Sequence, residues 1–130
     1  MTGIARGAGR SGAESDISGV VAAFTHWSED QYFYEPDGSQ MDLTGLIFYF
    51  QFRRSADQTG ADVTLSTTGN LSIVASTSGT SCILRISVPS GTFSAYTQDM
   101  IADLVAVDST GNETLYGHGV VTFTNNPVTV

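Results

Sequence analysis

Residues 42–54 read Asp42-Leu43-Thr44-Gly45-Leu46-Ile47-Phe48-Tyr49-Phe50-Gln51-Phe52-Arg53-Arg54, and this stretch decides the fold class. A turn-forming Asp-Leu-Thr-Gly sequence leads directly into the most hydrophobic and most aromatic run of the chain. Successive side chains of an extended backbone point to opposite faces, so one face receives Leu46, Phe48, Phe50 and Phe52, and the other Ile47, Tyr49, Gln51 and Arg53. This aromatic alternation predicts a strand with a fully buried inner face, with Phe50 at the centre of the core.

Shorter alternating segments, separated by turn residues, lie on both sides of this strand. Together with it, they predict strands at residues 31–34, 46–53, 61–66, 71–74, 81–88, 99–107 and 113–124. Residues 92–98 lack strict alternation and are expected to hold a short helical turn. Strand spacings of about eight to fifteen residues are typical of a sandwich. The sequence therefore predicts an all-β, immunoglobulin-like antiparallel β-sandwich of about seven strands in residues 21–130. The cysteine–tryptophan–cysteine signature of antibody domains is absent.

The first 20 residues differ in composition from the rest of the chain. They contain five glycines, many small residues and few apolar ones. Such a segment has little to bury, so residues 1–20 are predicted to form a flexible Gly/Ala/Ser-rich N-terminal arm. Arg6 and Arg10 give this arm a local positive charge. Two interpretations stay open: a disordered leader, or an arm that orders on a neighbouring subunit and sets its arginines against an acidic surface.

The length of 130 residues suits a single domain with one ordinary core. The chain has thirteen acidic residues, five arginines and no lysine, which gives a net charge of −8. No basic face could be assembled from this composition, so a nucleic-acid partner is not expected. The acidic residues are scattered singly, as solubility alone would require. No secretion-signal pattern opens the chain and no apolar run approaches about 18 residues, so we expect no membrane partner.

The residues that usually carry chemistry form no recognisable catalytic motif. His26 and His118 lie in the first and last thirds of the chain, without the spacing of metal ligands. No Gly-x-Ser-x-Gly elbow is present. Calcium could use Asp37 and Asp42, but the ordered spacing of a calcium loop is missing. We therefore expect a protein that is not an enzyme, with no catalytic residues, metal or cofactor.

Two residue types in this sequence have both a structural and a functional interpretation. Cys82 lies in an alternating apolar strand, which favours a buried free thiol over a nucleophile or ligand. Tyrosines on strands usually cover and edge a sandwich, but exposed rings could also stack on sugars. A carbohydrate-binding face would then draw on Tyr32, Tyr34, Tyr49, Tyr96 and Tyr116.

Several motifs, in order along the chain, resemble a known family. The Asp-Leu-Thr-Gly entry and its alternating strand are similar to those of the immunoglobulin-like amino-terminal domain of phage baseplate upper proteins and related small tailed-phage virion proteins. The resemblance continues through Trp27-Ser28-Glu29-Asp30, Thr64-Leu65-Ser66-Thr67, Ile83-Leu84-Arg85-Ile86-Ser87-Val88, Ile101-Ala102-Asp103-Leu104-Val105-Ala106 and Gly119-Val120-Val121-Thr122-Phe123, and it covers residues 24–130. Ala102 departs from the family's usual Tyr, and residues 90–98 depart from its usual Ala/Leu-rich turn.

This resemblance implies a non-enzymatic structural virion protein of a tailed bacteriophage, assembled in the host cytoplasm. Its expected place is the tail, baseplate or neck, where it would join other virion proteins in multiple copies. Two alternatives stay open: a capsid decoration protein on the phage head, and a carbohydrate-binding module that contacts a host-surface glycan. The family carries no catalytic residues. The side chains expected to make assembly contacts are Arg6, Arg10, Tyr32, Tyr34, Arg53 and Arg54.

Overall fold

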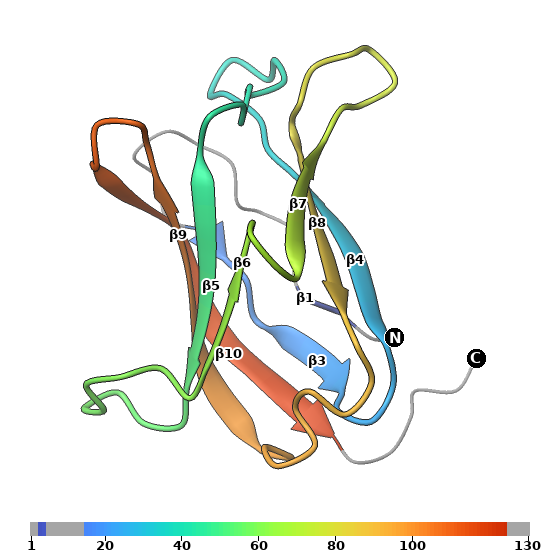
Figure 1. The fold of residues 1–130 in the computed structure, drawn as a ribbon, viewed down its shortest axis with the longest axis vertical. Helices are drawn as coiled ribbons and strands as arrows, with labels where there is room; N and C mark the ends of the chain where they lie inside the picture. The colour runs from blue at the N-terminus through green and yellow to red at the C-terminus, as the bar shows by residue number, and fades with distance from the viewer. Residues whose placement is uncertain (1–2, 5–14, 125–130) are drawn as a thin grey trace.

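The computed structural model describes residues 3–4 and 15–124, and within these ranges the chain is all-β, with two sheets and no helix (Figure 1). The strands are β1 (Gly3–Ile4), β2 (Ser15–Asp16), β3 (Gly19–Ala22), β4 (Trp27–Tyr32), β5 (Ile47–Arg53), β6 (Val63–Ser66), β7 (Leu71–Val74), β8 (Ile83–Val88), β9 (Asp99–Val107) and β10 (Glu113–Thr124). The predicted all-β class is confirmed.

The two sheets have different sizes. The large sheet has the order β1-β3-β10-β9-β5-β6, and β2 also pairs with β10; the small sheet has the order β4-β8-β7. β5, β9 and β10 form the antiparallel centre of the large sheet, where Phe50 is the register partner of Leu104. The long hairpin of β9 and β10 contains a bulge between Leu115 and Gly117. Such a bulge bends the strand and strengthens its twist.

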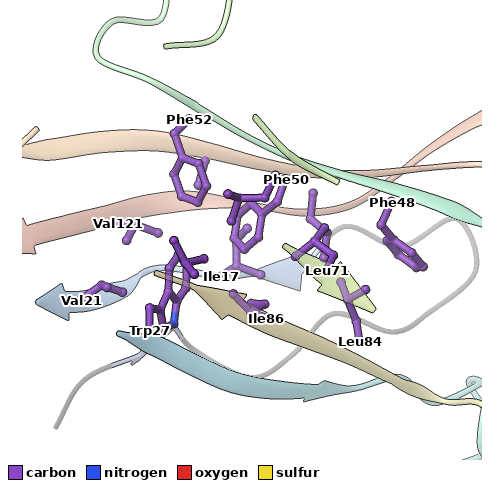
Figure 2. Close-up of a cluster of buried hydrophobic side chains, with 14 of the residues drawn as sticks. Ile17, Val21, Trp27, Phe48, Phe50, Phe52, Leu71, Leu84, Ile86 and Val121 are labelled. Atoms are coloured by element: carbon purple, nitrogen blue, oxygen red, sulfur yellow. The ribbon is translucent and has the colours of Figure 1, made fainter. Parts of the chain in front are cut away.

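The core lies between the two sheets and is dominated by aromatic rings. Phe48, Phe50 and Phe52 of β5 are fully buried, as the alternation predicts. Trp27 of β4 reaches across from the small sheet and meets Phe50 and Phe52 edge-on, at 6.1 Å between ring centroids in each case. Figure 2 shows the side chains of β4 and β8 pointing toward those of β5. Buried aromatic pairs of this geometry add to the stabilisation that comes from area alone.

Three predicted strands match the structure residue for residue: 71–74, 99–107 and 113–124. The first predicted strand, at 31–34, is displaced, because the structure places β4 at Trp27–Tyr32. The helical turn expected at 92–98 is wrong. That segment consists of consecutive turns, with the amides of Thr92, Ser94 and Tyr96 bonded to the carbonyl three residues earlier.

The N-terminal boundary also differs from the prediction. Residue 20, the expected end of the flexible arm, lies inside β3, and Ile17 is a fully buried part of the core. The sandwich was predicted to be antiparallel. In the structure β2 and β3 both pair with β10 in parallel, so the large sheet is mixed. The sandwich therefore begins by Ser15. Most of the predicted arm, residues 5–14, lies outside the described part of the chain.

Candidate interaction surface

The outward side of the large sheet carries an unusual number of apolar side chains. Because strand side chains alternate, every residue between the buried positions of β5, β9 and β10 points away from the core. We call this side the large-sheet face. Its apolar members are Val20, Ile47, Tyr49, Ile101, Val105, Val107, Leu115 and Val120.

Much of the exposed apolar surface of the described chain lies on this face. Six large hydrophobic side chains of the described chain are exposed, and four of them belong to the face: Val20, Ile47, Leu115 and Val120, each between 37% and 43% accessible. The other two, Phe24 and Tyr34, lie in connecting segments. Single exposed hydrophobic residues are ordinary, but a gathering on one flat sheet face marks a contact surface.

A row of charged side chains crosses the centre of the same face. The guanidinium of Arg53 on β5 bonds the carboxylate of Asp103 on β9, with 3.0 Å between Nη2 and Oδ2. The other carboxylate oxygen lies 2.6 Å from Nδ1 of His118 on β10. Asp16 on β2 is the register partner of His118 and interacts with it electrostatically. The row therefore runs Arg53, Asp103, His118, Asp16 across four neighbouring strands.

The end of this row at Asp16 depends on two glycines of β10. A Cβ atom at Gly117 would lie 2.7 Å from Cγ2 of Ile17, and one at Gly119 would lie 2.7 Å from the backbone nitrogen of Ser18. Only glycine leaves room for the N-terminal segment to cross so close to the strand. The Ser18 hydroxyl also accepts a hydrogen bond from the Val120 amide, at 3.0 Å. The Gly-His-Gly sequence thus holds residues 16–18 against the sheet.

The outward side of the small sheet is polar instead. Asp30 on β4 and Arg85 on β8 are register partners and form a two-pronged ion pair, with distances of 2.9 and 3.1 Å. The hydrogen bonds to Asp30 raise the pKa of the Arg85 guanidinium. Ser28 and Glu29 complete the lining of a shallow hollow at this pair. Within the small sheet the guanidinium and the carboxylate therefore match each other's charge.

The predicted assembly contacts do not form one surface. Arg53 lies on the large-sheet face, whereas Arg54 follows the end of β5 and pairs with Asp62 at 3.1 Å. Tyr32 is half-buried at the end of β4, and Tyr34 pairs with Gln40 in the loop that follows. Arg6 and Arg10 lie outside the described residues.

The five tyrosines do not line a common platform either. Tyr116 is in the core, 5.7 Å from the ring of Phe33, and burial raises the pKa of its hydroxyl. Tyr96 packs against the core and lies 5.9 Å from the Arg54 guanidinium. Of the five, only Tyr49 belongs to the large-sheet face. Sugar stacking needs several rings on one accessible side, and this arrangement provides no such side.

The remaining side chains that could carry chemistry have structural roles in the described part of the chain. Within the described residues, no three His, Cys, Asp or Glu side chains lie where they could share a metal ion, and no helix could cross a membrane. Cys82 is buried and free, as predicted. The two aspartates considered for calcium, Asp37 and Asp42, instead bond the amide and hydroxyl of the residue two places on, Ser39 or Thr44. Each closes a turn.

The central residues Asp103 and His118 were not predicted as part of a site. Asp103 is separated from Arg53 by 50 positions and from His118 by 15, and only strand register brings the three together. The strand pattern itself was the first signal in the sequence. In residues 99–107 apolar residues occupy both the odd-numbered and the even-numbered positions, which indicates a strand with apolar side chains on both faces. The glycines around His118 were the second signal.

Comparison of the chain with models of known families, with curated proteins and with solved structures found no match.

Proposed function

We propose that this chain is a non-enzymatic structural protein of a tailed-phage virion, assembled in the host cytoplasm, that acts by protein–protein contact in the tail, baseplate or neck. The observation that carries the contact role is the large-sheet face, with its apolar side chains around a central charged row. Cores of protein interfaces combine apolar area with a few oriented polar groups in this way. The virion setting comes from the sequence resemblance.

The order of strands supports an immunoglobulin-like domain as the scaffold. In that fold, strands B, E and D share one sheet, and C, F and G share the other, which a C′ strand can extend. Here β4, β8 and β7 occupy the first set of positions, and β5, β9, β10 and β6 the second. We propose the immunoglobulin-like topology on this correspondence. The outer side of the C, F and G strands then stays open to solvent.

A direct test is to ask whether the chain is part of a particle. Particles released by a strain that carries the coding sequence are purified and quantified by mass spectrometry, relative to their major head protein. The proposal predicts that the chain copurifies with intact particles. Its absence from intact particles, despite expression in the cell, would contradict a virion role.

The same measurement narrows the location in the particle. About three to twelve copies per particle are expected of a neck or baseplate component. Hundreds of copies would instead mean the tail tube or the head, where a decoration protein would sit. Sugar binding has less support, because the tyrosines lie apart, and a glycan array with the purified chain tests it separately.

A further inference from the structure

We infer that the large-sheet face binds the same face of a second copy of this chain, about a two-fold axis that runs parallel to the strands between β9 and β10. This inference rests on the proposed role of the face in protein contact and names its occupant. Two-fold pairing brings the same patch together on both copies, so the patch must complement itself. The arrangement of its charges meets that requirement.

The row alternates between basic and acidic side chains across the sheet. Its order is Arg53, Asp103, His118 and Asp16, on β5, β9, β10 and β2. A half-turn about a line between β9 and β10 reverses this order in the second copy. Asp103 then lies opposite the second copy's His118. The side chain of Arg53, which reaches the row from the level of Ile101, is directed toward the second copy's Asp16. Every carboxylate faces a basic side chain, which fixes the register of the pair.

The apolar side chains flank this row on both sides and also match themselves. Leu115 and Val105 are register partners on β10 and β9, and so are Val120 and Ile101. The same half-turn sets Leu115 of one copy over Val105 of the other, and Val120 over Ile101. Apolar side chains thus meet apolar side chains on either side of the charges. Water would be excluded from the apolar parts of the interface, which surround a central polar row.

The size of the face is adequate for a stable contact. The five adjacent strands β3, β10, β9, β5 and β6 have 4, 12, 9, 7 and 4 residues, and at about 4.8 Å between strands and about 3.3 Å per residue they cover on the order of 600 Å² in projection. Side-chain relief raises the accessible area above that value, toward the ~800 Å² per partner of a standard interface. Packed sheets keep their strand directions within about 30° of each other, which an axis along the strands satisfies. The net charge of −8 opposes pairing, but physiological salt screens it over about 8 Å.

The test is sedimentation of the full chain over concentrations up to about 100 µM, which detects affinities of micromolar order. The wild-type chain should dimerise. Leu115→Asp places a carboxylate in the apolar part of the face and should weaken the dimer at least about tenfold. The control is Phe24→Asp, because Phe24 is also an exposed hydrophobic residue, at 47% against 37% for Leu115, but lies off the face; its dimer should be unchanged. Circular dichroism and a melting curve establish that each variant is folded.

A cross-linking experiment tests the axis without a disruptive charge. Val105→Cys chains and Leu115→Cys chains are prepared separately, then mixed with a short bismaleimide. The inference predicts linked dimers in the mixture and in each variant alone, because the axis passes between two strands only about 4.8 Å apart and so brings positions 105 and 115 of both copies close together. The wild-type chain serves as the blank, because its one cysteine, Cys82, is buried.

Three results would overturn the inference: a wild-type chain that stays monomeric at every concentration, a Leu115→Asp chain that dimerises normally, or a mixture of the two cysteine variants that forms no cross-links. These failures are distinct from failure of the proposed function. If the chain is monomeric but present in particles, the face binds another virion protein and only the inference fails. If it dimerises as described but is absent from particles, only the virion role fails.

Discussion

Ile17 occupies the space that a side chain at Gly117 would need, since a Cβ at Gly117 would lie 2.7 Å from Ile17 Cγ2. Ile17 is fully buried in the core, so it cannot turn aside into solvent. We therefore expect Gly117→Ala to destabilise the protein by about 1–3 kcal/mol, the usual cost of overpacking a core. Urea denaturation followed by tryptophan fluorescence measures this loss through Trp27.

Gly60→Ala is the matched control, because a Cβ there meets nothing within 4 Å and its backbone is not in the left-handed region. Its effect should stay within about 0.5 kcal/mol. The double variant Ile17→Ala with Gly117→Ala should lose less than the sum of the two single losses, since the clash is gone. Strict additivity would show that the two residues do not compete for the same space.

Phe50 is the central side chain of the core, and its loss should be among the most damaging. It stacks on Phe52 at 4.6 Å, meets Trp27 across the sandwich and is fully buried. Phe50→Ala should cost about 3–5 kcal/mol on chemical unfolding, because a large cavity remains. Tyr49→Ala, one position away on the outward face, should cost about 1 kcal/mol or less. Similar losses for both variants would contradict the observed orientation of β5.

The strands that could be predicted are those whose buried face is apolar at every second residue. β9 is the clearest example, with Met100, Ala102, Leu104 and Ala106 all buried in alternation. β4 escaped the prediction because two of its inward positions are polar. Glu29 accepts hydrogen bonds from the Trp27 indole and the Gln31 amide, so polar side chains satisfy each other where an apolar pattern was expected. Local pairing of this kind removes the periodic signal.

The N-terminal strands and the charged row could not be predicted for a different reason. The residues that form them lie far apart along the chain. Ile17 is a single apolar residue in a glycine-rich segment, and its burial depends on glycines a hundred positions later. Arg53 was proposed as a contact from its place at the end of a strand, but its partner Asp103 is set by the pairing of β5 with β9. Composition and periodicity describe neighbours in sequence and do not determine such register.

Cys82 should be chemically silent in the folded protein. It is fully buried between two backbone hydrogen bonds, one from its own amide and one to its carbonyl, and it has no disulfide partner. Thiol reagents need an accessible thiolate. We expect labelling by iodoacetamide to be negligible in buffer and complete in denaturant, as measured by mass spectrometry. Rapid labelling in buffer, with the protein still folded by circular dichroism, would be incompatible with a buried thiol.

Acid should destabilise the protein through the carboxylates that close its turns. Asp16, Asp37, Asp42 and Asp108 each accept hydrogen bonds from the amide and hydroxyl of the residue two places on. The side-chain hydrogen bond is the largest cause that lowers the pKa of each below its ordinary value of 3.8.

A carboxyl whose pKa is lower in the folded state stabilises the fold above the unfolded-state pKa, and this contribution is lost as the pH falls through the folded-state value. The urea midpoint should therefore stay level from pH 7 to about pH 5 and decline below about pH 4. Asp42→Asn together with Asp108→Asn keeps an oxygen acceptor in both turns but removes their titration. The double variant should be less stable than the wild type at pH 7 and should lose less of its stability between pH 5 and pH 3. A decline as steep as that of the wild-type chain would mean that other groups govern unfolding in acid.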